Sequence, residues 1–216
     1  MVDRINYKRF LMISLGVSII IFTAGLLLGV SLDDAKVNDL LFNINQNELN
    51  TESYLIEKEF ISTFGGDECS LSNPRVDEIS QEIANIGRLL TRYESGNLID
   101  EDEFNYLKRK YFLLEIKAYS LFTSLKEKCN YDYQTILFFY DIDSDESANQ
   151  GNVLDALANL NKNVYIFSFD RKFTEDPTLE TLKIHYDIKK SPTLVINDNV
   201  KQEGLTNLED LSNLIE

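Results

Sequence analysis

The stretch from Tyr186 to Asp198 constrains the fold of this chain more than any other. In it, an apolar run, Thr193–Ile196, follows directly on Ser191 and Pro192. Proline lacks the backbone N–H that a central strand needs, so it is tolerated only at the start or the edge of a strand. The sequence therefore predicts a strand that begins just after Pro192, and an X–Pro bond at such a place can be cis.

Short apolar runs and helical patterns alternate around this strand, from about residue 131 to the end of the chain. Runs bounded by polar residues favour buried strands, and apolar residues at three- and four-residue steps favour helices. The expected elements are strands at 135–140, 163–169, 193–196 and 200–202, and helices at 153–160, 177–186 and 208–215, the last capped by Asn207. Such an alternation predicts an α/β sheet with a right-handed crossover.

The order of these elements resembles the thioredoxin fold over roughly residues 132–216. The resemblance rests on the strand–loop–helix segment 138–160 and on the segment 186–198. It implies that Ser191, Pro192 and Thr193 form a cis-proline loop that faces the position of a redox motif. It also implies that this loop binds extended polypeptide by pairing with its backbone.

The redox motif itself departs from the family pattern. Where members of the family carry two cysteines, this chain has Ser144-Asp145-Glu146-Ser147. A serine hydroxyl does not ionise as a thiol does and cannot form a disulfide. We therefore expect no thiol–disulfide exchange at this loop, no catalytic residue and no cofactor, and we lean toward a protein that is not an enzyme.

Acidic residues in the same loop raise the alternative of a calcium site. Asp141, Asp143 and Asp145 alternate as they do in the first half of a calcium-binding loop. Glu146, however, stands where such a loop needs glycine, and Asn152 stands where it needs glutamate. We therefore predict no metal, and interpret the acids as solvating the loop and favouring the start of the following helix.

The single histidine, His185, is the only candidate base for a serine nucleophile. Nothing in the sequence directs it toward Ser144 or Ser147, so we interpret it as a residue of an amphipathic helix.

The N-terminal stretch Phe10–Leu32 contains no charged residue. As a helix it would be about 34 Å long, enough to cross a bilayer. A signal peptide would have a shorter apolar region, and only a weak cleavage site is present at Gly29–Ser31. Basic residues precede the stretch and acidic residues follow it, which places residues 1–9 in the cytoplasm and the rest outside. The sequence thus predicts a single-pass protein of the cell membrane.

Between this stretch and the predicted α/β domain, the sequence of residues 33–130 predicts helices. A linker at 33–66, with a possible break near 47–51, leads to two helices that begin after Pro74 and at an Asp100–Glu103 capping pair. Both helices repeat apolar residues at a/d spacing, which favours an antiparallel, coiled-coil-like hairpin. The apolar seams are Val76, Ile79, Ile83, Ile86, Leu90 and Tyr93 in the first helix and Phe104, Leu107, Tyr111, Leu114, Ala118, Leu121 and Leu125 in the second.

The two cysteines flank this hairpin: Cys69 precedes it and Cys129 follows it. An antiparallel hairpin brings its ends together, so we predict a structural disulfide, which would close a loop of about 60 residues. The alternative is a redox-active pair, as in an envelope thiol–disulfide oxidoreductase or its partner.

The predicted fold class is thus an α/β thioredoxin-like domain preceded by an all-α helical hairpin and one N-terminal transmembrane helix. The expected domains are a cytoplasmic N-terminus (1–9), a transmembrane helix (10–32), a helical linker (33–66), a disulfide-tied hairpin (67–130) and a thioredoxin-like domain (131–216).

Charge limits the partners. The chain has 36 acidic and 21 basic residues, a net charge of −15, so nucleic acid is excluded as a partner. The first functional hypothesis is a membrane-anchored extracytoplasmic protein that binds a polypeptide. The alternatives are an oxidoreductase that uses Cys69 and Cys129, and an accessory subunit of a membrane complex. The small-residue spacing of Gly25 and Gly29 adds oligomerisation through the membrane helix.

Overall fold

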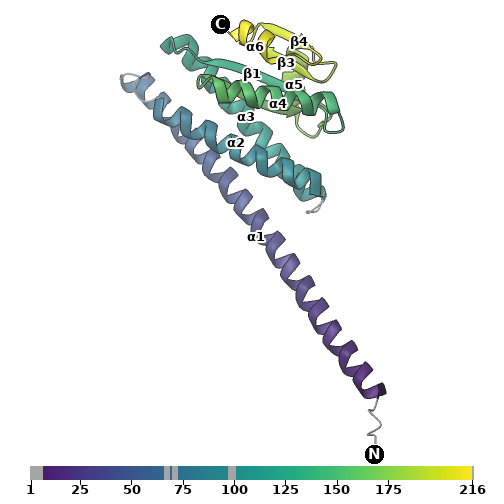
Figure 1. Cartoon of the computed structure of the whole chain (residues 1–216). Helices are drawn as coiled ribbons and strands as arrows, with labels where there is room; N and C mark the ends of the chain where they lie inside the picture. Colours follow the sequence, from purple (N-terminus) through teal and green to yellow (C-terminus); the bar gives the residue numbers. More distant parts are fainter. Residues whose placement is uncertain (1–6, 66–68, 70–72, 97–100, 216) are drawn as a thin grey trace, which may run out of the picture. The chain divides into compact units, whose positions relative to one another are not determined.

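The computed structural model describes residues 7–65, 69, 73–96 and 101–215. It is a mixed α/β protein with a four-stranded sheet (Figure 1). The elements are α1 (Tyr7–Phe64), α2 (Asn73–Gly96), α3 (Glu101–Cys129), β1 (Gln134–Tyr140), α4 (Asp145–Leu160), β2 (Val164–Asp170), α5 (Pro177–His185), β3 (Thr193–Ile196), β4 (Val200–Glu203) and α6 (Leu208–Ile215). The chain divides into two compact units, Met1–Phe42 and Asn43–Glu216.

The predicted transmembrane helix is wrong, because no helix among the described residues is long and apolar enough to cross a membrane. The stretch Phe10–Leu32 is not a helix of its own but part of α1, which continues without the expected break to Phe64. The predicted single-pass topology and cell-membrane location rest on that helix, so they are wrong as well.

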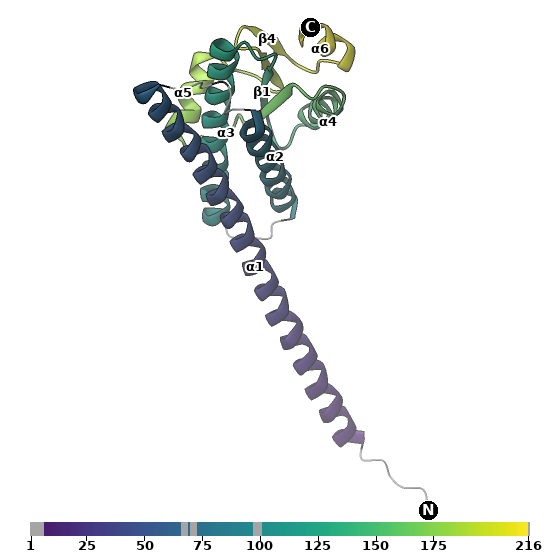
Figure 2. The ribbon, with the colours of Figure 1, turned by 90° about the vertical axis from the view of Figure 1, so that its left-hand side faces the viewer.

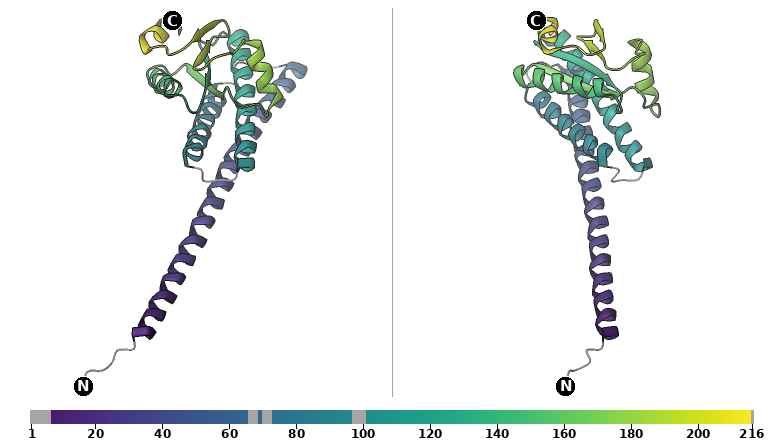
Figure 3. Two further views of the ribbon diagram at one scale, coloured as in Figure 1. Left: turned by 90° about the vertical axis from the view of Figure 1, so that its right-hand side faces the viewer. Right: turned by 45° about the vertical axis from the view of Figure 1, so that its right-hand side comes forward.

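The helical hairpin is confirmed: α2 and α3 lie side by side (Figure 3). Proline at the second position of α2 suits a helix start, because its missing N–H has no partner there in any helix. Both predicted seams are in contact with the core, and all their members except the half-buried Phe104 are buried. The expected Asp100–Glu103 capping pair lies partly outside the described residues.

Gly87 of α2 lies directly against the Tyr111 side chain of α3. A Cβ at Gly87 would lie 2.5 Å from the hydroxyl oxygen of Tyr111. That hydroxyl cannot easily move, because it is buried and donates a hydrogen bond of 2.6 Å to Glu115.

Gly87→Ala should therefore destabilise the protein by about 1–3 kcal/mol through overpacking, although alanine is the better helix former. Urea unfolding would measure the change. In a Tyr111→Phe background, which lacks the hydroxyl, the same substitution should cost less. An equal cost in both backgrounds would contradict the proposed contact.

The sheet has the strand order β2-β1-β3-β4. β1 runs parallel to β2 and antiparallel to β3, and β4 is antiparallel to β3. The register pairs Tyr140 with Asp170 and Phe139 with Thr193. The loops that follow β1 and β2 and the segment that precedes β3 therefore meet at one end of the sheet.

Helices cover both faces of the sheet (Figure 2). Successive side chains of a strand point to opposite faces, and β1 shows this directly. Ile136 and Phe138 belong to a core cluster with Leu154 of α4 and Leu211 of α6. On the other face, α3 packs onto β2, with ring centroids 5.7 Å apart for Phe112–Phe169 and 5.8 Å apart for Phe122–Phe167.

α3 is buried on one side against α2 and on the other against β2. The side that faces β2 contains polar residues. Lys108 and Asp170 are both buried, and the Lys108 Nζ lies 2.7 Å from a carboxylate oxygen of Asp170. Glu115 accepts a hydrogen bond of 2.8 Å from the backbone N–H of Ser168, on the outermost strand of the sheet. Burial raises the pKa of the Glu115 carboxyl well above its usual range.

The disulfide between Cys69 and Cys129 is confirmed, and their Cα atoms are 5.5 Å apart. Asn130, the residue after Cys129, lines the same cavity as Asn197. Asn197 follows the last residue of β3, whereas Pro192 precedes its first residue. The disulfide is therefore next to the end of the sheet that is opposite Pro192.

Candidate functional site

The loop after β1 uses both of its serines to build the start of α4. Ser144 is the N-cap, and its hydroxyl oxygen accepts a hydrogen bond of 3.2 Å from the backbone N–H of Ser147. The buried Ser147 hydroxyl oxygen accepts a hydrogen bond of 3.1 Å from the backbone N–H of Asp141. Asp145 and Glu146 lie in the first turn of α4, where negative charge is favoured.

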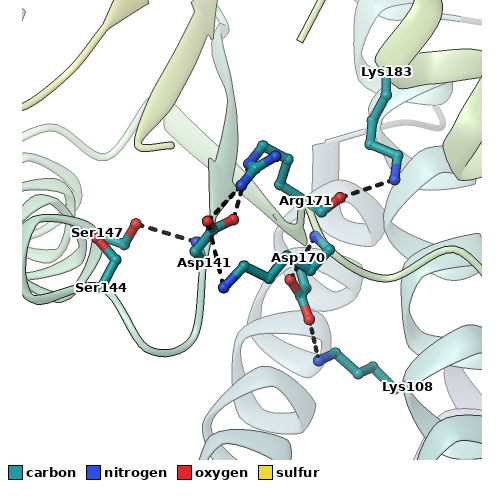
Figure 4. A network of polar contacts seen from close by, with 8 residues as sticks. Lys108, Asp141, Ser144, Ser147, Asp170, Arg171 and Lys183 are labelled. Atoms are coloured by element: carbon teal, nitrogen blue, oxygen red, sulfur yellow. Dashed lines mark hydrogen bonds and ion pairs between the residues drawn. The ribbon is translucent and has the colours of Figure 1, made fainter. Parts of the chain in front are cut away.

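Asp141 connects this loop to the segment after β2 (Figure 4). Its carboxylate accepts two hydrogen bonds from the Arg171 guanidinium, at 2.9 Å and 2.6 Å. The Lys172 ammonium lies 3.8 Å from one of the same oxygens. The segment that carries these two cations is itself held by Lys183, which donates hydrogen bonds of 2.9 Å to the carbonyls of Arg171 and Phe173.

The pKa of Asp141 reflects this setting. Burial raises it, but hydrogen bonds from Arg171 and from the Ser191 side chain, with the charges of Arg171 and Lys172, outweigh burial and lower the pKa overall. The carboxylate thus touches both the segment after β2 and the residue before Pro192. Asp141 holds three segments of the chain together at one end of the sheet.

A carboxyl with a lowered pKa stabilises the folded state fully above its unfolded pKa of about 4, and loses that contribution as the pH falls through its folded pKa. Asp141→Asn should therefore cost about 2 kcal/mol at pH 7, the value of hydrogen bonds to a charged group. The difference in unfolding free energy between variant and wild type should shrink below pH 4. Urea titrations at pH 7 and pH 3 would test this, and a difference that does not depend on pH would contradict the ion pair.

The segment before β3 presents free backbone groups. The Ser191–Pro192 peptide bond is cis. Pro192 and Thr193 are buried, Ser191 is half-buried, and the Thr193 hydroxyl donates a hydrogen bond of 2.8 Å to the carbonyl of Lys190. Within the part of the chain that the structure describes, the backbone N–H and C=O of Ser191 form no hydrogen bond.

The loop after β4 closes the other side of this segment. The backbone N–H of Gly204 donates a hydrogen bond of 2.8 Å to the carbonyl of Pro192. The next residues are bound by α4: Leu205 N–H donates to Glu146 at 3.1 Å and Thr206 N–H donates to Gln150 at 2.7 Å. Gly204 has a φ of +88°, a backbone conformation that residues other than glycine rarely adopt.

The remaining candidates do not join this cluster. Asp143 is exposed, and His185 is exposed at the end of α5 with its ring against Tyr186. The described residues contain no group of three or more acidic, histidine or cysteine side chains that could hold a metal. The arrangement offers hydrogen-bond donors and acceptors, but no activated nucleophile.

The sequence reasoning missed Arg171 and Lys172. A signal was present, because Asp141 follows the first predicted strand of the sheet and Arg171 follows the second. Parallel strands end at the same edge of a sheet, so the residues after them meet there. An acid after one strand and two bases after the next indicate an ion pair.

No protein-family model matches the chain, and no curated protein matches it in sequence. Among solved structures, one described as a malarial protein is similar over 38% of this chain and 93% of its own, with 20% identity and a TM-score of 0.34. Chloroplastic thioredoxin z is similar over 43% of this chain and 82% of its own, with 17% identity and a TM-score of 0.34. Both similarities are weak, and neither carries an argument about function.

Proposed function

We propose that this chain is a protein-binding module that holds an extended polypeptide through the backbone of Ser191. The observation that carries the proposal is that the N–H and C=O of Ser191, one residue before the start of a buried segment, have no hydrogen-bond partner among the described residues. A donor and an acceptor on one residue are what an added strand needs for pairing. The resemblance to the thioredoxin fold assigns the same use to this loop.

The rigidity of the surrounding segments supports the proposal. Asp141 bonds to Arg171 and lies against Ser191, and Gly204 bonds to the carbonyl of Pro192. Backbone groups that are already fixed lose little conformational entropy when a peptide pairs with them. Such a site can bind a peptide without the entropic cost of ordering its own backbone.

The chemistry of the neighbouring loop supports binding without exchange. Ser144 and Ser147 accept backbone hydrogen bonds, and neither can form the mixed disulfide on which thiol exchange depends. The chain's two cysteines are joined to each other. A polypeptide held at Ser191 would therefore be released unchanged.

The competing hypothesis from the sequence is thiol exchange by Cys69 and Cys129. The Cys69–Cys129 bond is next to the end of the sheet that is away from Ser191. No observation therefore favours thiol exchange over a structural role for this bond. Its reduction potential separates the two hypotheses, as described in the Discussion.

Removal of the Ser191 N–H tests the proposal. Decapeptides selected from a displayed random library on the immobilised chain would serve as the probe. Ser191→Pro, which lacks the N–H, should weaken binding of a selected peptide at least tenfold. Ser191→Ala keeps the N–H and loses only the hydroxyl, so its affinity should stay within about twofold of wild type.

Circular dichroism and thermal melting would establish that both Ser191 variants are folded. The proposal fails if the library yields no peptide that the wild-type chain binds. It also fails if folded Ser191→Pro binds the peptide as tightly as Ser191→Ala does.

A further inference from the structure

α1 carries an exposed apolar stripe on its C-terminal part, in the unit that begins at Asn43. Its members are Leu49, Ile56, Phe60 and Phe64, with exposed fractions of 58%, 63%, 60% and 73%. Their spacings of seven, four and four residues place them within an arc of about 80° on the helix. We call these four residues the α1 stripe.

The α1 stripe faces away from the rest of its unit. On the opposite side of the helix, Ile44 is 1% exposed and the Lys58 ammonium donates a hydrogen bond of 2.9 Å to Ser124 of α3. The stripe therefore adds nothing to the core of this unit. Its apolar surface is on the order of 500 Å², within the range of the largest patches on monomeric proteins, which are often functional.

Acidic residues border the stripe. Glu52 and Glu59 are exposed along one edge together with Glu48, which already forms an ion pair of 3.5 Å with Lys110 of α3, and Glu57 lies on the other edge. From Asn43 to Phe64 the only basic residue is Lys58, which points to α3. A helix that packs on the stripe would place its own flanking residues beside these carboxylates.

We propose that the α1 stripe binds an amphipathic helix of another protein whose apolar face is flanked by lysine or arginine. Apolar burial would supply the affinity, and the basic flanks would pair with Glu52 and Glu59 across the interface. This interaction surface is separate from the Ser191 site, and it does not depend on the function proposed there.

A second copy of the chain fits the stripe less well. In an antiparallel pair, the edges that carry Glu52 and Glu59 would face each other. In a parallel pair, Glu52 would face Glu57 of the other copy. Like charges in these positions destabilise helix pairing, and the net charge of −15 adds to the repulsion between copies.

Three synthetic helical peptides and the full chain test the proposal. The first has leucine at the a and d positions and lysine at e and g. The second replaces the lysines by glutamates. The third keeps the lysines but spreads the leucines around the helix. Fluorescence anisotropy should show binding of the first peptide, and at least tenfold weaker binding of the other two.

Variants of the chain locate the binding surface. Leu49→Ser/Phe60→Ser should weaken binding of the first peptide at least tenfold without changing any charge. Ile184→Ser, at a residue of α5 that is 77% exposed, is the matched control and should leave the affinity unchanged. Raising the salt from 50 to 500 mM should weaken binding as well.

Each opposite result overturns the proposal. If the first peptide does not bind, the stripe does not recognise a basic helix. If the third peptide binds equally, or the stripe variant binds as wild type does, the attraction is charge alone. If sedimentation shows a dimer that Leu49→Ser/Phe60→Ser dissociates, a second copy covers the stripe.

Discussion

Lys108→Met is expected to lower the free energy of unfolding by about 3–5 kcal/mol, because it leaves a buried carboxylate without its partner. Lys108 and Asp170 are buried, with side-chain exposed fractions of 5% and 6% and an N–O distance of 2.7 Å. Methionine fills a similar volume, so the loss would come from the uncompensated charge of Asp170 rather than from a cavity. Chemical denaturation at pH 7 measures it.

A double-mutant cycle separates charge from packing. In Lys108→Met/Asp170→Asn neither member of the pair is charged, so the double variant should be more stable than Lys108→Met alone. Lys162→Met, at an exposed lysine after α4, should change stability by less than about 0.5 kcal/mol. If Lys108→Met costs no more than this control, the pair does not stabilise the fold.

The double variant Cys69→Ser/Cys129→Ser should lose about 4 kcal/mol of stability. The disulfide joins residues separated by 60 positions, and the chain-entropy model gives this value for a loop of that length. The effect acts on the unfolded chain, so the folded hairpin should keep its helical content. Urea unfolding of the variant and of the reduced wild type should agree, and a loss below about 1 kcal/mol would contradict the model.

The reduction potential of the Cys69–Cys129 bond tests its role independently. A structural disulfide has a potential below about −300 mV, whereas catalytic pairs lie near −120 to −270 mV. We expect the lower value, measured by equilibration in thiol buffers of known potential. A value in the catalytic range would favour thiol exchange and count against the binding function proposed here.

Much of the fold could be predicted because it depends on local patterns. The apolar seams of α2 and α3 have the spacing of a helical face, and β1, β2 and β3 are short, mainly apolar runs between polar residues. Pro74 and Pro177 stand at or next to the first positions of their helices, and Asn207 caps α6 through a hydrogen bond of 2.9 Å to the backbone N–H of Asp210. These features require no knowledge of distant residues.

The candidate site could be predicted only in part. Two short patterns could be recognised in the sequence: Ser144 with Ser147, and Ser191 with Pro192. The ion pair of Asp141 and Arg171 depends on strand register across 30 positions. The burial of Lys108 and Glu115 was missed for a related reason. They are charged residues between the aromatic residues on the face of α3 that packs against β2, and their burial depends on that packing.

The sequence by itself determined the strands, the helices from α2 onward and the two serines at the start of α4, since propensity and side-chain chemistry are properties of neighbouring residues. It misled us about the apolar N-terminal stretch, where composition alone predicted a separate membrane helix and the structure has one continuous α1. Only the tertiary structure decided that Asp141 bonds to Arg171, and that no residue in the described part of the chain pairs with the backbone of Ser191. Partners far apart in the chain become neighbours only when the sheet has formed.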